Sequence, residues 1–485
     1  MAKDKKNVTT DEAEPKKKKQ KKVKTREQKL VRKRTNIIIC LCVFGVVFMF
    51  FGICGITTKV GSDALLKACA AVDEVKYTAE VNPNPILPVL GEDGKAKKDD
   101  NGNFNFIDKT GELDKRNFKV LQITDVHIGA GAFSIRTDKY TINTVEDLIR
   151  KAQPDLVVVT GDIAYPVFFQ SATLDNQKEA RAFATLMENL GVYWTFAFGN
   201  HDTELYSSFT REQIGKFYAE TPEFKHCIYS NHATLNGKEV SGTGNFAINI
   251  KDKNEELVHS IFMVDSNSYR DDDPLGMKWH YDGIHKDQIS WYQNMTKTLG
   301  LVDNDGNISA DASSSMWFHI PIIEFRKAFE EWQANGNSDT ANVIMRNGYN
   351  GEWARGALGT DIDNGIYNVL CDNGTTGVFC GHDHYNNGQM LYKKDGRELN
   401  LTYGMSIDYL AYPGIYKKTA QRGGRIVEIN AKNNLKAVDK WDVAKDYNQD
   451  NFTDDNTKYG FATYRLPYWI DRNNDNAAVT LPEGK

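Results

Sequence analysis

Residues 118–127 read FKVLQITDVH, and residues 156–162 read LVVVTGD. In each segment a largely apolar and β-branched run is followed by an aspartate, which is typical of a buried strand followed by a polar loop. Between them, residues 144–153 show a helical pattern that stops at Pro154, because proline cannot continue a helix. The two segments therefore predict a strand–helix–strand unit.

The same alternation continues downstream. A second helix is expected over residues 176–190, with Gly191 placed to end it, and a third strand over residues 193–198. Strands that alternate with helices predict parallel pairing through right-handed crossovers. Further strand-like runs are residues 245–250, 260–264, 316–320, 377–380 and 425–429. The pattern indicates an α/β fold.

The N-terminal region differs from this body. Residues 37–56 contain no charged side chain, and a helix of that length, at about 1.5 Å per residue, spans a hydrocarbon core of roughly 30 Å. Residues 1–34 contain 15 Lys/Arg and 5 Asp/Glu, which favours a cytoplasmic N-terminus. A cleaved signal peptide is the alternative, although its apolar region is usually only about 7–15 residues long. We expect an uncleaved, single-pass membrane anchor with the body outside the cytoplasm.

The rest of the chain is acidic, with 45 Lys/Arg against 60 Asp/Glu. We expect no nucleic-acid binding, because such binding depends on neutralising phosphates. The seven cysteines show no C-x-x-C spacing, so neither a zinc ribbon nor a disulfide framework is indicated.

Composition divides the chain into five parts. Residues 57–115 are rich in Pro, Gly, Asn, Asp and Lys, which favours a linker or a loosely attached edge. We expect a basic cytoplasmic tail at 1–35, a transmembrane anchor at 36–57, a linker at 58–115, a folded domain at 116–445 and an irregular extension at 446–485.

Five polar clusters lie at or just after expected strands. They are Asp125-Val126-His127, Gly161-Asp162, Gly199-Asn200-His201-Asp202, His319-Ile320-Pro321 and Gly381-His382-Asp383-His384. They include five of the ten histidines, and the carboxyl ends of strands in open α/β sheets converge on one crevice. A mixed set of carboxylate, imidazole and amide groups suits Mn, Fe or Zn better than Ca or Mg.

The order D-x-H, G-D, G-N-H-D, H and G-H-x-H resembles the calcineurin-like metallophosphoesterase superfamily. The resemblance covers residues 117–430, and residues 318–321 and 381–386 are most similar to short purple-acid-phosphatase-like proteins. It implies a two-sheet αββα sandwich, joined here to the N-terminal transmembrane helix. The second sheet follows from the resemblance and not from the strand pattern.

The resemblance also implies a role for each polar residue. Asp125, His127 and His384 would hold one metal ion, Asn200, His319 and His382 would hold the other, and Asp162 would bridge the two. His201 would face the scissile phosphate and protonate or stabilise the leaving oxygen, and Asp202 would orient His201. Two ions about 3.5–4 Å apart can clamp both oxygens of an in-line displacement, with metal-bound hydroxide as the nucleophile.

The implied reaction is hydrolysis of a phosphate ester, with a phosphomonoester favoured. A phosphodiesterase or pyrophosphatase acting on nucleotides or lipid head groups is one alternative, and a non-catalytic surface binding protein is another. Tyr165 stands where purple acid phosphatases place an iron-binding tyrosinate, but His127 would compete for that position. Both a ligand role and a packing role stay open for Tyr165.

Overall fold

The computed structural model describes residues 25–71, 81–347, 358–412, 422–429 and 461–465. The chain divides into two units, Met1–Ile53 and Cys54–Lys485. The second unit contains both sheets and all five polar clusters.

Two sheets form the centre of the second unit. The smaller has the order β15-β14-β2-β3-β4, with β15 at Phe461–Arg465, β14 at Gly423–Ile429, β2 at Phe118–Ile123, β3 at Leu156–Thr160 and β4 at Trp194–Ala197. The larger has the order β1-β7-β8-β9-β11-β13-β12-β10, with β1 at Phe104–Ile107, β7 at Phe246–Lys251, β8 at Leu257–Met263, β9 at Ser313–Trp317, β11 at Thr375–Cys380, β13 at Arg397–Tyr403, β12 at Gln389–Lys394 and β10 at Val343–Asn347. A short hairpin, β5 (Thr234–Leu235) and β6 (Lys238–Glu239), stands apart.

The predicted parallel unit is confirmed. Strand β2 pairs parallel with β3, and β3 pairs parallel with β4. All five side chains of β3 are buried, as expected of a strand covered on both faces. In the larger sheet, β8, β9, β11 and β13 are also parallel. Parallel pairing brings the carboxyl ends of each set to one edge of its sheet.

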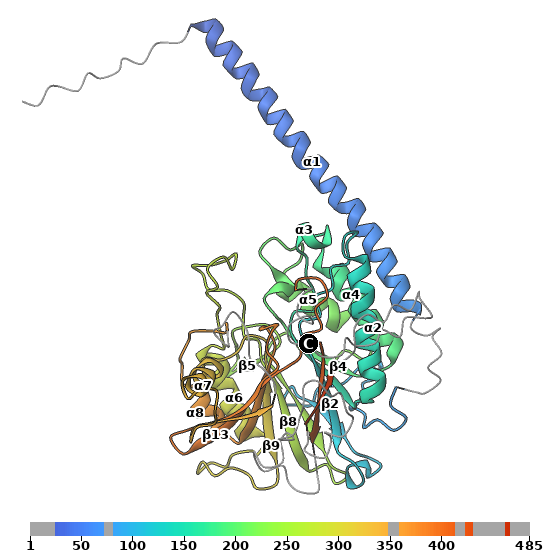
Figure 1. Ribbon diagram of the computed structural model, residues 1–485. Helices are drawn as coiled ribbons and strands as arrows, with labels where there is room; N and C mark the ends of the chain where they lie inside the picture. The colour runs from blue at the N-terminus through green and yellow to red at the C-terminus, as the bar shows by residue number, and fades with distance from the viewer. Residues whose placement is uncertain (1–24, 72–80, 348–357, 413–421, 430–460, 466–485) are drawn as a thin grey trace, which may run out of the picture. The chain divides into compact units, whose positions relative to one another are not determined.

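The helices cover the outer faces of the sheets (Figure 1). On the smaller sheet lie α2 (Ile135–Ala152) and α4 (Asn176–Leu190), with α5 (Arg211–Glu220) against α4; on the larger lie α6 (Lys286–Thr298), α7 (Ile323–Ala334) and α8 (Ile366–Asp372). The Asp175 side chain accepts a hydrogen bond from the Lys178 backbone at the start of α4. Gly191 ends α4 in a left-handed conformation, as its position in the sequence predicts. The αββα sandwich is therefore confirmed.

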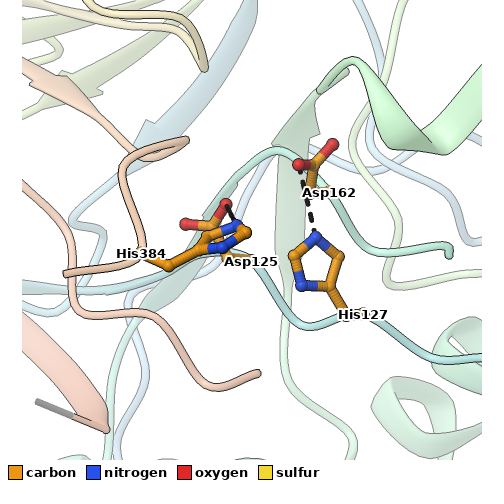
Figure 2. A group of neighbouring side chains, drawn as sticks. All are labelled: Asp125, His127, Asp162 and His384. Carbon is orange, nitrogen blue, oxygen red and sulfur yellow. Dashed lines mark hydrogen bonds and ion pairs between the residues drawn. The ribbon is translucent and has the colours of Figure 1, made fainter. Parts of the chain in front are cut away.

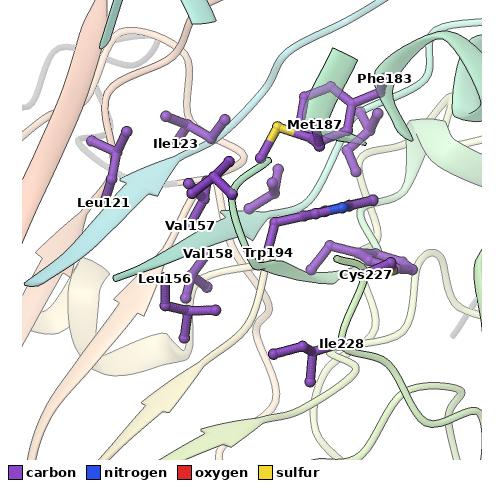
Figure 3. Close-up of a cluster of buried hydrophobic side chains, with 14 of the residues drawn as sticks. Leu121, Ile123, Leu156, Val157, Val158, Phe183, Met187, Trp194, Cys227 and Ile228 are labelled. Atoms are coloured by element: carbon purple, nitrogen blue, oxygen red, sulfur yellow. The ribbon is translucent and has the colours of Figure 1, made fainter. Parts of the chain in front are cut away.

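A continuous apolar core joins the smaller sheet to its surroundings. It includes Val157 and Val158 of β3, Phe183 and Met187 of α4, and Trp194 of β4 (Figure 3). Trp194 is fully buried and packs edge-on against Phe183, with 5.1 Å between the ring centroids. The same cluster extends to Phe246, Trp317 and Phe379 of the larger sheet. Burial of these large side chains fixes the sheets against each other, and so fixes the edges that carry the polar clusters.

The interpretation of residues 58–115 as a linker is wrong for the residues described. β1 pairs with β7 at the edge of the larger sheet, and Phe104 and Phe106 are buried. Upstream, the Ile86 backbone donates to Asp155, and residues 58–70 continue helix α1. The linker was predicted from the polar composition, but the Asn and Asp residues here form tight, ordered turns. For example, Asp99 Oδ1 accepts hydrogen bonds from the backbone of Asn101 and Asn103.

Helix α1 (Arg26–Ala70) contains an 18-residue window with a mean hydropathy of 3.0. It is long and apolar enough to cross a membrane, by length and composition. Its last part, residues 54–70, belongs to the second unit, and Leu65 and Cys69 lie in the core cluster.

At the other end of the chain, β15 is regular within the extension expected to be irregular. The remaining residues of 446–485 lie outside those described.

Candidate metal centre

All the predicted site residues follow strands at the carboxyl edges of the two sheets. Asp125 and His127 follow β2, Asp162 follows β3, and Asn200 follows β4; His319 follows β9, and His382 and His384 follow β11. Backbone hydrogen bonds tie these loops together, for example from His127 N to Asp162 O and from Gly381 N to His319 O. The structure therefore brings all seven side chains to one place between the sheets, and all seven are buried.

Four of these side chains form one group, shown in Figure 2. Ligand atoms of Asp125, His127, Asp162 and His384 all lie within 4.8 Å of one another. His384 Nε2 is 3.2 Å from Asp125 Oδ1, and His127 Nε2 is 3.4 Å from Asp162 Oδ2. Two imidazoles and two carboxylates around one point are a donor set that fits a transition metal ion.

A second group lies beside the first. His382 Nδ1 is 3.0 Å from Asn200 Oδ1 and 3.3 Å from His319 Nε2. His319 Nε2 is also 3.2 Å from Asn200 Oδ1. Two ring nitrogens and an amide oxygen face a common point, so this group offers a second ligand set of mixed N and O atoms.

Asp162 belongs to both groups. Its Oδ2 is 3.4 Å from His127 Nε2 and 3.1 Å from His319 Nε2, while its Oδ1 accepts from the His201 backbone at 2.8 Å. Burial alone would raise the pKa of Asp162, but the charges of His319 and His201 hold it well below the usual range. A carboxylate that stays ionised between two imidazole groups is well placed to bridge two cations.

The hydrogen bonds of the imidazoles orient their free nitrogens toward these groups. His319 Nδ1 is 2.7 Å from the Thr160 carbonyl oxygen, and a carbonyl only accepts, so Nδ1 carries a proton. His127 Nδ1 lies 3.3 Å from Asp408 Oδ1. Each Nε2 therefore faces the site. The buried His384 Nε2 lies 3.2 Å from Asp125 Oδ1 but makes no hydrogen bond to the described residues, so its lone pair can be given to an ion, as in metal-binding histidines.

Electrostatics agree with a cation site. Burial lowers the pKa of His319, but the charge of Asp162 outweighs burial and raises the pKa to about 9. The pKa of His382 is held well below its ordinary value by burial and by His319. The carboxylates around His319 therefore stabilise positive charge at that place, and His382 keeps a free lone pair. The residues present fit two metal ions.

The backbone is strained at the same residues. Asp125, His127, Asp162 and His382 have φ values of 50°, 49°, 55° and 75°, in the left-handed region that non-glycine residues adopt at a cost of about 1–3 kcal/mol. A side chain at Gly199 would overlap Asp162, and one at Gly161 would overlap His319. The loops are therefore shaped to aim ligand side chains, and strain of this kind clusters at functional sites.

His201 lies beside the two groups but makes a different contact from the expected one. Its Nδ1 is 2.8 Å from Glu204 Oε1. The expectation that Asp202 orients the His201 ring is wrong, because both Asp202 oxygens accept from backbone groups. Asp202 binds the N–H of Asp162, Ala164 and Gly199 and so holds the loops after β3 and β4 together. Burial and Asp162 raise the pKa of Asp202 to about 6.

Two carboxylates at the site were missed from the sequence. Glu204 contacts His201, and its Oε1 also accepts from the Tyr269 hydroxyl at 3.2 Å. Asp408 lies against His127 Nδ1, and its Oδ2 is 3.9 Å from His384 Nδ1. The Arg422 guanidinium fixes the Asp408 backbone carbonyl. The signal for Glu204 was its distance of three residues from His201; Asp408 follows β13, which was not predicted.

Tyr165 packs its ring against both His127 and His201, with 4.9 Å between the centroids in each case. Its hydroxyl donates to Gln170 Oε1 at 2.9 Å. Burial raises the pKa of Tyr165 above its ordinary value, which opposes a tyrosinate. These contacts favour the packing role.

Comparison with known families agrees with this arrangement. The model of the calcineurin-like phosphoesterase family matches residues 118–386, which is more than half of the chain and includes all seven clustered side chains. The chain belongs to this family. Metal binding by an Asp/His cluster at the strand ends is the expected property of such a member.

Individual relatives are more distant. Probable inactive purple acid phosphatase 14 of Arabidopsis thaliana is 26% identical over 61% of this chain and 71% of its own length. Probable inactive purple acid phosphatase 28 of the same plant is 23% identical over 68% of this chain and 79% of its own length. Phosphatase DCR2 of Saccharomyces cerevisiae is 26% identical over 67% of this chain and 53% of its own length. The relatives therefore include both a phosphatase and proteins described as inactive.

Proposed function

We propose that this protein hydrolyses a phosphate ester at a dinuclear metal site. The observation that supports it most is the position of Asp162, whose Oδ2 lies within 3.4 Å of imidazole nitrogens from both ligand groups. A non-catalytic binding protein of the same fold would not need this set of donors. The relatives described as inactive make that alternative worth testing.

We assign Asp125, His127 and His384 to one ion, Asn200, His319 and His382 to the other, and Asp162 to both. Mn, Fe and Zn suit this mixture of nitrogen and oxygen donors. When bound, such ions activate water and neutralise charge on a phosphoryl group. Asp408 keeps the proton of His127 on Nδ1, so that Nε2 stays available to the ion.

His201 is assigned to the leaving oxygen of the ester. Burial lowers the pKa of His201, but Asp162 and Glu204 together raise it above the ordinary value. Glu204 fixes the Nδ1 proton, which leaves Nε2 to hold a proton toward the substrate. An imidazole in this state can act as a general acid near neutral pH. Glu204 acts through His201 and is a positioning residue.

Replacing Glu204 with Gln is expected to lower kcat about tenfold while metal content stays the same. The amide keeps the shape of the side chain but removes the charge that favours protonated His201, so the basic limb of the pH–kcat profile should move to lower pH. Glu188→Gln is a matched control, because Glu188 binds His226 Nδ1 at 2.7 Å outside the site. Equal profiles for Glu204→Gln and wild type would contradict this role.

The substrate class can be separated by direct assay. The full chain, loaded with Mn, Fe or Zn in turn, would be given a phosphomonoester, a phosphodiester and a pyrophosphate. We expect the monoester to be hydrolysed fastest, since the motifs are most similar to those of short purple-acid-phosphatase-like proteins. Preference for the diester or pyrophosphate would select the first alternative, and no hydrolysis with bound metal would select the binding protein.

We further propose that α1 is an uncleaved anchor, with the N-terminal tail cytoplasmic and the sheets extracytoplasmic. Leu65 and Cys69 are almost completely buried, and Asn189 donates to the Cys69 carbonyl at 2.8 Å. Cleavage after the small residues Ala68-Cys69-Ala70 would remove these side chains from the core. Because cleavage would remove part of the core, we expect that the helix is retained and is not removed as a signal peptide.

A further inference from the structure

Four large apolar side chains are exposed in the three segments that follow β2, β3 and β4, near the carboxyl edge of the smaller sheet. Phe169 is 89% exposed, Leu205 69%, Phe133 66% and Tyr206 40%. We call these four residues the apolar rim. Hydrogen bonds link the loops, from the Phe133 backbone to the Ser171 carbonyl and from Ser208 to Leu174. Large apolar groups that remain in water on adjoining segments are a feature of interaction surfaces.

The segment that follows Phe169 is hydrogen-bonded to α1 just beyond the apolar run of that helix. Thr57 Oγ1 donates to the Ala172 carbonyl at 2.6 Å, and Thr58 Oγ1 is 2.6 Å from Thr173 Oγ1. The apolar run ends at Ile56 and the first charged residue after it is Lys59, so a membrane-spanning α1 would leave the lipid near these threonines. Phe169 precedes Ala172 by three helical residues in α3 (Phe168–Ser171), or roughly 5 Å along the axis. Phe169 is therefore close along the chain to the residues that contact the end of the apolar run.

The rim also adjoins the metal centre on two sides. Gln170, next to Phe169, accepts from the Tyr165 hydroxyl, and the Tyr165 ring contacts His201. Glu204, next to Leu205, contacts His201 directly. Phe169 is thus linked to His201 through its neighbour Gln170 and through Tyr165, and Leu205 is linked to His201 through its neighbour Glu204. Molecules in a surface that contacts the rim would therefore lie close to the metal centre.

We propose that the apolar rim docks on the lipid bilayer and that the site receives a phosphate ester carried by a membrane lipid. Aromatic and aliphatic side chains are favoured at the lipid–water boundary, where their rings replace water with acyl chains. The lipid substrate rests on the proposed function, whereas docking rests on the rim and on α1. Docking holds the apolar rim against the leaflet, so that the ester reaches His201 without leaving the membrane.

Docking can be measured on the full chain in nanodiscs of phosphatidylcholine with brominated acyl chains. Phe169→Trp adds one indole to the eight natural tryptophans. The fluorescence of the added indole is the fluorescence of the variant minus that of the wild type. We expect bromine to quench more than half of this excess. Ile308→Trp is the control: Ile308 is 49% exposed and precedes β9, at the amino ends of the parallel strands. An unquenched Trp at 169, or equal quenching at both positions, would overturn docking.

The substrate is tested with two esters on the same nanodiscs, dioleoyl phosphatidate in the bilayer and p-nitrophenyl phosphate in solution. The double variant Phe133→Ser/Phe169→Ser is expected to lose about tenfold in kcat/KM on phosphatidate and to keep the wild-type value on the soluble ester. Ile308→Ser should match wild type on both. Hydrolysis of the soluble ester alone, or equal losses on both esters, would overturn the lipid substrate. Hydrolysis of neither would refute the proposed function, while quenching would still decide docking.

Discussion

Replacing Asp162 with Asn is expected to lower kcat/KM by on the order of 10³-fold or more and to reduce the bound metal below two ions per chain. Asp162 Oδ2 lies close to both ligand groups, at 3.4 Å from His127 Nε2 and 3.1 Å from His319 Nε2. An amide has one oxygen for one ion and no charge for either. The carboxylate also accepts from the His201 backbone, so the loop after β4 loses a charge-assisted bond.

Metal content by elemental analysis, together with steady-state kinetics, checks this result. Asp108→Asn is a suitable control, because Asp108 is a buried carboxylate that binds backbone groups of Glu112 and Leu113 far from the site. A thermal unfolding scan of each variant separates loss of metal from loss of fold. Two ions per chain and full activity in the Asp162 variant would contradict its bridging role.

Replacing His201 with Ala is expected to leave two metal ions bound and to lower kcat by about 10²–10⁴-fold. His201 has Glu204 on Nδ1 and is assigned to the leaving oxygen, whereas the ligand groups are complete without it. The loss should therefore be large for an ester with a poor leaving group. It should be smaller for p-nitrophenyl phosphate, whose leaving group needs little protonation.

The matched control is His226→Ala, since His226 also binds a glutamate but lies outside the site. Its kinetics and metal content should equal those of wild type. Undiminished turnover of both esters by the His201 variant would refute the assigned role. Loss of metal from that variant would place His201 among the ligands instead.

The sequence was informative where one strong physical pattern decided the structure. The β-branched run 156–160 is buried on both faces of a parallel sheet, and that environment leaves a continuous apolar segment. The carboxyl ends of β2, β3 and β4 meet at one edge of that sheet, which places Asp125, Asp162 and Asn200 near one another. His319 follows a strand of the other sheet, and its place beside Asp162 was expected only from the family resemblance. Helix α2, in contrast, begins at Ile135, nine residues before the expected start.

The rest depended on contacts between distant or weakly patterned segments. Glu204 and Asp202 are both acidic and both close to His201 in sequence, and only the turn after Asn200 decides which one meets the ring. Asp408 follows β13, whose residues 399–403 alternate between apolar and polar side chains after the Asp395-Gly396 turn, so a strand signal was present there and was overlooked. The polar stretch before β1 formed ordered turns because its Asp and Asn side chains bind their own backbone.

The most direct test of the account is anomalous diffraction from crystals of the metal-loaded protein. Two anomalous peaks are expected, about 3.5–4 Å apart, and Asp162 should contact both. Asp125, His127 and His384 should surround one peak, and Asn200, His319 and His382 the other. A single peak, or two peaks that Asp162 does not join, would contradict the dinuclear site.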